Sequence, residues 1–223
     1  EESFSYLEKL RALPETLLLN TNEDLDIKLF SSTYSIELTL HAIIGQFEKG
    51  LDLVPQIEEG FRLYGDKINS VRKAYIEANI SILYFCKEEY NAALKWSNQL
   101  LNNADIDQTL DIFCFTQILN LLIHLELENV RLAPYALKSA QRYLQTRNRT
   151  YKFESVMLAF IGTKLKCKSE EETELAYSEL YSDLMEIKSD PFEKAAFEYF
   201  DFIAWTRSKI NKSSFKDELL KKA

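Results

Sequence analysis

Residues 81–94 read SILYFCKEEYNAAL, a polar Lys-Glu-Glu turn between two apolar stretches. Two looser copies of this turn occur elsewhere, each with a small residue or proline shortly after it. The three copies are Gly45-Gln46-Phe47-x-x-Gly50-Leu51, Glu88-Glu89-Tyr90-x-x-Ala93-Leu94 and Glu128-Asn129-Val130-x-x-Ala133-Pro134. A repeat of this kind is typical of a helix-turn-helix array, in which one helix pair buries its apolar face only by stacking on the next. The sequence therefore predicts an all-α fold, a right-handed array of antiparallel helix pairs.

The apolar spacing around these turns places the pairs along the chain. Pairs are expected over about 25–64, 70–102, 110–146 and 151–187, with a capping helix over about 191–209. Pro55 predicts a kink or a later start in the second helix of the first pair. The stretch after residue 110 is apolar nearly all round, which indicates a helix contacted on more than one side. We expect a single domain, residues 1–223.

Composition argues against several other classes of protein. The 223 residues are 46% hydrophobic and 28% charged, the balance of a soluble folded chain. Only 5 Gly and 4 Pro occur, too few for the tight turns of an all-β or doubly wound fold. The formal net charge of −8 argues against a nucleic-acid partner, because binding phosphates needs a basic surface.

The cysteines and the absence of long apolar runs indicate the compartment. The chain has three widely spaced cysteines and no CxxC pair, and they are Cys86, Cys114 and Cys167. This pattern argues against a disulfide framework and against a zinc site, and it suits a reducing compartment. Each is expected to be a small buried side chain. No apolar run approaches the roughly 20 residues needed to span a bilayer. We expect a cytoplasmic protein without a membrane partner, and the lack of a starting Met is compatible with a piece of a longer protein.

The stretch 74–107 resembles a tetratricopeptide repeat. Ser81 and Tyr84 fill the places of a small residue and an aromatic in the first helix. Tyr90 and Ala93 fill those of an aromatic at the start of the second helix and a small residue three positions on. Small residues let the two helices approach, and the rings fill the gaps beside them. The whole chain resembles the divergent helical repeat proteins of bacteria, an α-solenoid fold that binds other proteins.

The resemblance also implies an inner groove lined by the first helix of each pair. By motif position its lining would include Tyr75, Asn79, Ile82, Phe115, Ile118 and Leu122. Because these residues are mostly apolar, we expect a hydrophobic peptide or a partner helix there rather than a clamped carboxylate. The alternative is that the chain fills its own groove, so that these residues belong to the core.

Basic residues gather around one turn of this acidic chain, and they are Lys138, Arg142, Arg147, Arg149 and Lys152. Such a cluster favours an acidic partner, and a nucleic-acid backbone less so. The alternative is a cationic helix C-terminus that interacts with the helix macrodipole.

No pattern in the sequence indicates catalysis. His41 and His124 lie at matching places of two repeats, without an H-x-x-x-H or E-x-x-H spacing, and we expect structural roles for both. The sequence contains no G-x-S-x-G, no P-loop and no G-x-G-x-x-G. We therefore expect no catalytic or metal-binding residue and no cofactor. The hypothesis is a non-catalytic protein–protein interaction scaffold, with a homodimer left open. The alternative is a peptide- or ligand-sensing regulatory domain of a longer signalling or transcription-control protein.

Overall fold

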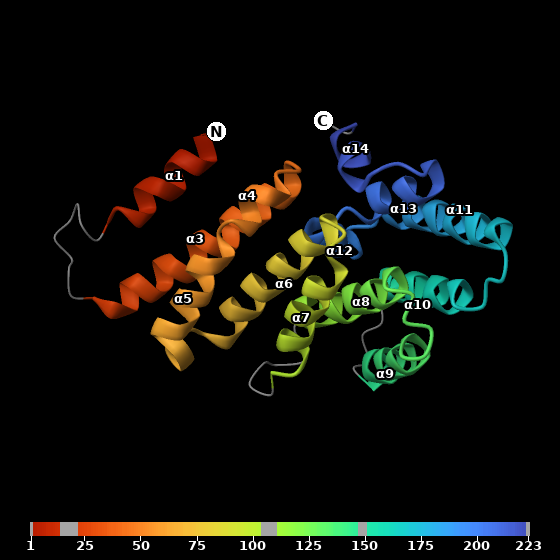
Figure 1. Cartoon of the computed structure of the whole chain (residues 1–223), viewed down its shortest axis with the longest axis horizontal. Coiled ribbons are helices and arrows are strands. Elements are labelled where there is room, and N and C mark those ends of the chain that lie inside the picture. The colour runs from red at the N-terminus through yellow and green to blue at the C-terminus, as the bar shows by residue number, and fades with distance from the viewer. Residues whose placement is uncertain (1, 14–21, 104–110, 147–150, 222–223) are drawn as a thin grey trace. The chain divides into compact units, whose positions relative to one another are not determined.

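A computed structural model describes residues 2–13, 22–103, 111–146 and 151–221 of the chain (Figure 1). Across these ranges the regular structure is helical and no strand occurs, which confirms the all-α prediction. The helices form two compact units, an N-terminal unit (Glu1–Asp107) and a C-terminal unit (Gln108–Ala223).

The N-terminal unit is built from six α-helices and one short 3₁₀ helix in its described part. These are α1 (Glu2–Arg11), α3 (Glu23–Ile43), α4 (Phe47–Leu51), α5 (Val54–Tyr64), η1 (Gly65–Lys67), α6 (Ser70–Cys86) and α7 (Tyr90–Leu101).

Side-chain caps and one proline set several of these boundaries. The carboxamide of Asn22 accepts a hydrogen bond from Leu25 N at the start of α3, and Asn69 does the same for α6. Each cap satisfies a backbone N–H that has no partner inside the helix. Pro55 is the second residue of α5, and a short turn separates α5 from α4. The predicted interruption at this proline is confirmed.

The three copies of the repeated turn share one backbone conformation. Gly45, Glu88 and Glu128 all have positive φ, of 70°, 62° and 51°. In each copy the N–H of the next residue donates to the carbonyl five residues back, at 2.9 to 3.0 Å, and the left-handed residue donates to the carbonyl three back. This is the Schellman motif that ends many α-helices. The repeated sequence pattern therefore corresponds to a repeated turn geometry.

Close helix approach in the N-terminal unit depends on small residues. Ser81 Oγ of α6 donates to the carbonyl of Ala93 in α7 at 2.9 Å, and Ala93 is fully buried. Gly50 takes the place of Ala93 in the first copy. A Cβ there would lie 2.7 Å from Leu83 Cδ1, closer than side chains pack. The small residues of the motif thus permit α4 and α7 to pack closely on α6.

The first helix is attached to α3 by a mixed contact. Arg11 of α1 forms an ion pair with Glu37, and its guanidinium lies 4.4 Å from the centre of the Tyr34 ring. Leu7, also on α1, is buried. Both charge and cation–π attraction therefore hold α1 against α3.

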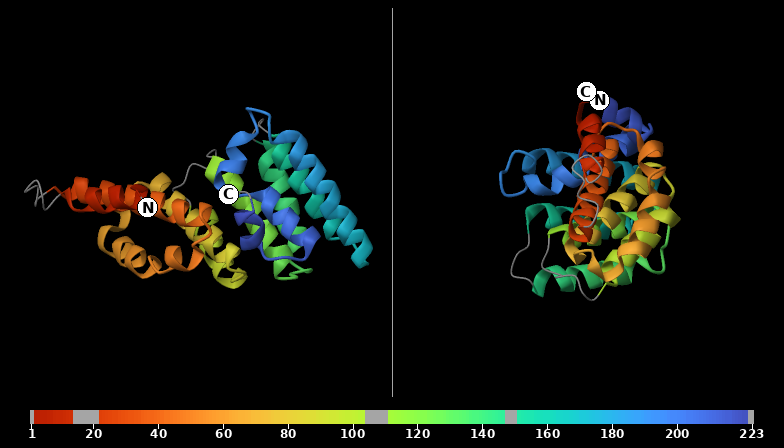
Figure 2. Two further views of the ribbon diagram at one scale, coloured as in Figure 1. Left: turned by 90° about the horizontal axis from the view of Figure 1, so that it is seen from above. Right: turned by 90° about the vertical axis from the view of Figure 1, so that its left-hand side faces the viewer.

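The C-terminal unit contains the remaining helices of the described chain. These are α8 (Asp111–Glu126), α9 (Ala133–Thr146), α10 (Lys152–Lys164), α11 (Glu170–Ile187), α12 (Lys194–Tyr199), α13 (Phe202–Asn211) and α14 (Phe215–Leu220). Buried residues occur on every side of α8, as its apolar composition predicted. α10 and α11 lie side by side (Figure 2).

Trp205 of α13 is the largest buried side chain at the centre of this unit. Its ring makes edge contacts with Phe160 and Tyr177, at centroid distances of 6.1 and 5.8 Å. The indole N–H donates to Glu126 Oε1 at 3.2 Å, and Lys209 Nζ lies 2.7 Å from the same carboxylate. The indole is thus enclosed by apolar contacts and its one polar atom is satisfied.

The capping helix expected over about 191–209 is interrupted in the structure. Phe200 has extended backbone angles and separates α12 from α13. The side chain of Asp201 then accepts a hydrogen bond from Ala204 N at 2.9 Å and caps α13. Phe200 instead stacks on Phe215 of α14, at a centroid distance of 5.1 Å. The break lets this ring pack under the last helix.

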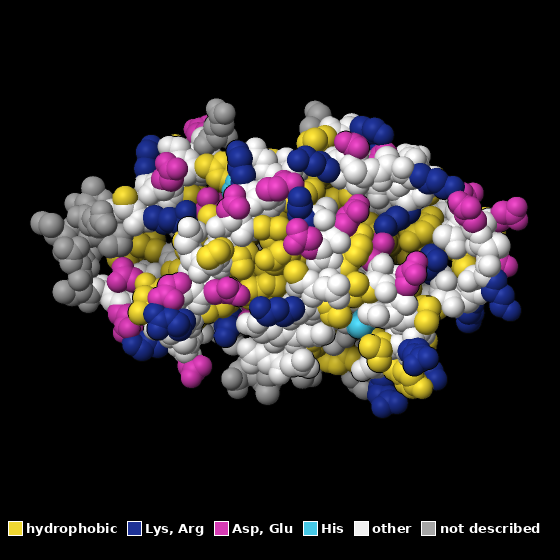
Figure 3. Space-filling model, viewed as in Figure 1, with side chains coloured by type: hydrophobic (Ala, Val, Ile, Leu, Met, Phe, Trp, Pro, Cys, Tyr) yellow, Lys and Arg dark blue, Asp and Glu magenta, His cyan; other side chains and the backbone are white. Residues whose placement is uncertain are grey.

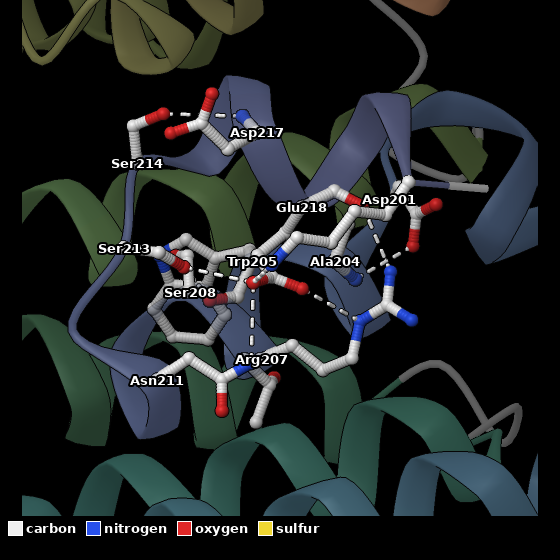
Figure 4. Close-up of polar contacts among 12 residues, drawn as sticks. Asp201, Ala204, Trp205, Arg207, Ser208, Asn211, Ser213, Ser214, Asp217 and Glu218 are labelled. Atoms are coloured by element: carbon white, nitrogen blue, oxygen red, sulfur yellow. Dashed lines mark hydrogen bonds and ion pairs between the residues drawn. The ribbon is translucent and has the colours of Figure 1, made fainter. Parts of the chain in front are cut away.

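A buried carboxylate holds α14 against α13 (Figure 4). Glu218 accepts hydrogen bonds from Lys221, Asn211 and Ser213, at 2.6 to 3.1 Å. These donors lower the pKa of the Glu218 carboxyl to about 2. The ion pair with Arg207 adds a further contact, at 3.4 Å. The C-terminal helix is therefore docked by an ionised side chain.

Candidate partner-binding surface

The six residues expected to line a groove are divided between the two units. α6 carries Tyr75, Asn79 and Ile82, and α8 carries Phe115, Ile118 and Leu122. Tyr75 is half-buried and the other five are buried. Within the N-terminal unit the Asn79 amide donates to Ser35 O and to Thr39 Oγ1 of α3, at 3.2 and 3.1 Å. At these positions the described chain therefore exposes little apolar surface.

The basic residues singled out from the sequence have different surroundings. Lys138 and Arg142 are exposed on α9. Lys152 begins α10, where its Nζ lies 3.2 Å from Asp190 Oδ2. The other two members, Arg147 and Arg149, lie outside the described residues.

α9 has one apolar and one basic face. Its buried residues are spaced as i, i+4, i+7 and i+11, and they are Ala133, Leu137, Ala140 and Leu144. A second row of residues has the same spacing and is shifted two residues toward the N-terminus. It begins with Arg131 in the turn before the helix and continues along α9 with Tyr135, Lys138 and Arg142. Two residues correspond to about 200° of rotation in an α-helix, so the two rows lie on opposite sides. We call the second row the α9 basic face.

The α9 basic face is exposed and unneutralised within the described structure. The Tyr135 side chain is 74% exposed, and Val130 and Leu132 are exposed beside it. Among the described residues, Arg131, Lys138 and Arg142 form no ion pair. Hydrophobic and basic side chains accordingly lie together over α9 in Figure 3. Exposed apolar and aromatic side chains among cations are typical of a binding surface.

Sequence reasoning missed Arg131 and Tyr135 as members of this face. A signal was available, since the chain contains no Asp or Glu between Glu128 and Glu154. A stretch of this length without an acidic residue stands out in a chain with a net charge of −8.

The C-terminal unit also has a small pocket between α8, α10 and α12. Its lining is mostly aromatic and aliphatic, with Phe115, Phe153 and Tyr199 among its walls. The buried Glu193 carboxylate accepts hydrogen bonds from Lys152 N and Phe153 N, both at 2.9 Å, so this side chain caps α10. The cavity volume of about 40 Å³ is enough for a few water molecules. Sites for small organic ligands begin near 300 Å³.

The two histidines have equivalent places in the repeated turns. The carbonyls of His41 and His124 both accept the longer hydrogen bond of a Schellman motif. Burial lowers the pKa of both imidazoles. His41 packs against the Phe4 ring at 4.8 Å, and His124 Nδ1 lies 3.1 Å from the Asn129 amide. In the described part of the chain no three His, Cys, Asp or Glu side chains are grouped so as to hold a metal ion.

One buried acid was not anticipated from the sequence. The Glu77 side chain in α6 is 0% exposed, and its Oε1 accepts a hydrogen bond from Gln99 Nε2 of α7 at 2.9 Å. Its Oε2 has no hydrogen-bond partner in the described structure. Burial raises the pKa of the Glu77 carboxyl to about 7. Because the group is closed to solvent, a substrate has no access to it in this structure.

The free thiols also differ among themselves. Cys86 and Cys114 are buried, as expected, whereas Cys167 is partly exposed at the end of α10. Burial raises the pKa of the Cys86 thiol, which disfavours the reactive thiolate.

No described helix is both long enough and apolar enough to cross a lipid bilayer. Comparison of the chain with protein-family models, with curated proteins and with solved structures finds no match.

Proposed function

We propose that this protein is a non-catalytic scaffold that binds an acidic protein partner through the α9 basic face. The observation that carries the proposal is the row of exposed cations around Tyr135, opposite a fully packed apolar row on the same helix. Cations without intramolecular partners favour association with a surface of opposite charge. An exposed tyrosine at the centre of such a row supplies rigid apolar contact area with a polar tip.

A tetratricopeptide-like architecture is part of this proposal. It is supported by the three Schellman turns and by the close contact between Ser81 and Ala93 in the α6–α7 pair. Stacking of such pairs in a right-handed array would present exposed helix faces and turns to partners. The burial of Ile82, Phe115 and their companions favours the basic face over an inner groove as the place of binding.

The alternative of a ligand-sensing domain receives less support. The enclosed pocket near Phe115 is about 40 Å³ in volume, well below the roughly 300 Å³ of small-molecule sites. The carboxylate of Glu193 inside it is already engaged by two backbone N–H groups. The hollow of about 310 Å³ beside Leu175 is shallow and open to solvent, so it would enclose little of a small ligand. Binding through an external surface accounts for more of the described features.

The proposal is tested by affinity capture from a lysate of the source organism, read by mass spectrometry. The unaltered protein is compared with a variant that carries Tyr135→Ser, Lys138→Gln and Arg142→Gln. A matched control carries Tyr6→Ser, Lys28→Gln and Lys216→Gln, which makes similar changes at exposed positions elsewhere.

We expect a protein partner that the unaltered chain and the control both retain and that the α9 variant loses at least tenfold. Captured partner should also fall as salt rises, because exposed charges are screened. A partner retained equally by the α9 variant would refute the assignment of the site.

A further inference from the structure

A second charged helix face occurs in the same unit, on α11. The helix contains seven carboxylates and no basic residue, and its acids are Glu170, Glu171, Glu172, Glu174, Glu179, Asp183 and Glu186. Lys212 pairs with Glu170 and Glu174, at 2.6 and 3.0 Å. In the described structure Glu179 and Asp183 are exposed and form no ion pair. We call the row formed by Leu175, Glu179 and Asp183 the α11 acidic face.

This face has an apolar depression at one end. Leu175 is 60% exposed and lies at the edge of a shallow hollow of about 310 Å³ between α10 and α11. Cys167 and Ala176 contribute to its wall, and Glu172 and Glu179 lie on its acidic side. Lys166 is the basic residue of the lining. The hollow is large enough for one aromatic side chain.

The two faces match in charge and in spacing. Along α9, Lys138 and Arg142 follow Tyr135 by three and seven residues, about 5 and 10 Å. Along α11, Glu179 and Asp183 follow Leu175 by four and eight residues, about 6 and 12 Å. With Tyr135 placed at Leu175 and the helices parallel, each cation would therefore meet a carboxylate. The antiparallel alignment would bring Arg142 to the basic residue Lys168.

From this complementarity we propose that the protein self-associates, the α9 basic face of one copy docking on the α11 acidic face of a second copy. The inference rests on the proposed function, because it uses the same α9 surface and identifies the acidic partner as this chain. Tyr135 fills the hollow beside Leu175, and Lys138 and Arg142 pair with Glu179 and Asp183. Because the two faces are different surfaces, each added copy leaves one of each kind free. Such head-to-tail contacts form rings or open chains.

The test uses the full chain and two complementary variants in sedimentation velocity at low salt. The basic-face variant carries Lys138→Gln and Arg142→Gln, and the acidic-face variant carries Glu179→Gln and Asp183→Asn. All four side chains are exposed, so each variant should keep the far-UV circular dichroism and the melting curve of the unaltered protein. A third variant, Tyr135→Ala, tests the anchor.

We expect the average mass of the unaltered protein to rise with concentration and to fall as salt is added. Each charge variant alone should sediment as a monomer. An equimolar mixture should form a 1:1 dimer that grows no further, because only one intact pair of faces remains. Tyr135→Ala should weaken association at least tenfold, as expected of a central aromatic anchor.

Two results would overturn self-association. One is an unaltered chain that stays monomeric at every concentration tested, and the other is a mixture of variants that forms no dimer. If a lysate partner still depends on Lys138 and Arg142, the scaffold function stands while self-association fails. Binding to vesicles that contain phosphatidylserine, without self-association or a protein partner, would refute both and assign α9 to an anionic lipid surface.

Discussion

Glu77→Gln should stabilise the N-terminal unit at neutral pH. The carboxyl is enclosed in α6 and α7, with one oxygen bonded to Gln99 and the other unpartnered in the described structure. The pKa is raised to about 7 by burial, against 4.5 for the free side chain, although Lys73 acts in the opposite direction. The folded chain therefore holds the proton more tightly than the unfolded chain does.

The sign of the pH dependence follows from this difference. The stabilising effect of the raised pKa is fully present below about pH 4.5 and is lost as the pH rises through about 7. A difference of about 2.5 pKa units corresponds to roughly 3 kcal/mol of lost stability at pH 8. The amide in the variant stays neutral and keeps the bond from Gln99, but its new N–H donors cost about 1 kcal/mol or more. We expect a net gain of about 1–2 kcal/mol at pH 8 and none at pH 5.

Urea unfolding measures this difference at pH 5, 6, 7 and 8. Trp96 lies on α7 next to the site, so both proteins would carry Trp205→Phe to leave it as the reporting fluorophore. Glu8→Gln, an exposed change on α1, is the control and should show no such pH trend. A stability difference between Glu77→Gln and the parent that stays constant from pH 5 to pH 8 would refute the reasoning.

Three further changes probe the turns, the packing and the C-terminal lock. Glu88→Gly should stabilise the fold by about 0.5–1 kcal/mol in urea unfolding, because φ is 62°, whereas Glu89→Gly, at negative φ, should destabilise it. Gly60→Ala should cost about 1–3 kcal/mol by overpacking, since its Cβ would lie 2.1 Å from Phe30; adding Phe30→Leu should recover part of the loss, and no recovery would contradict the clash. Glu218→Gln should speed proteolytic release of the C-terminal segment at pH 7, where the low pKa of this carboxyl stabilises the fold. That stabilisation declines as the pH falls below the ordinary value of 4.5 and is lost through the folded-state value of about 2, so the parent should become equally sensitive only near pH 2.

Local signals predicted much of the fold. The repeated turn could be recognised in the sequence because a Schellman motif has a short, defined spacing. This held even in the copy where Glu88 stands in place of the usual glycine. Pro55 indicated the break between α4 and α5 because proline lacks the N–H that a helix interior needs. The break at Phe200 escaped prediction. The apolar spacing around Phe200 also suits a continuous helix. The contact that favours the break is with Phe215, which lies on a later helix and is not indicated by the local sequence.

The site was harder to read from the sequence for a similar reason. Apolar positions such as Ile118 fit a groove lining and a core equally well, so only packing separates the two. The exposure of Lys138 and Arg142 was foreseeable from their charge. The placement of Arg131 in the turn before α9, in line with them, depended on where that helix begins. The acids of α11 by themselves fit an ordinary solvated helix face, and the hollow beside Leu175 depends on how α10 and α11 pack together.

The cap supplied by Glu193 bears on the order in which the chain folds during synthesis. The α6–α7 pair is closed by contacts between near neighbours in sequence, such as Ser81 with Ala93. The first turn of α10, in contrast, is completed by a carboxylate about forty residues downstream. On the ribosome, both helices of the α6–α7 pair and the contact between Ser81 and Ala93 are available once residue 101 has emerged. Until Glu193 follows, Lys152 N and Phe153 N lack the carboxylate that caps them, so we expect α10 to be completed only late in synthesis.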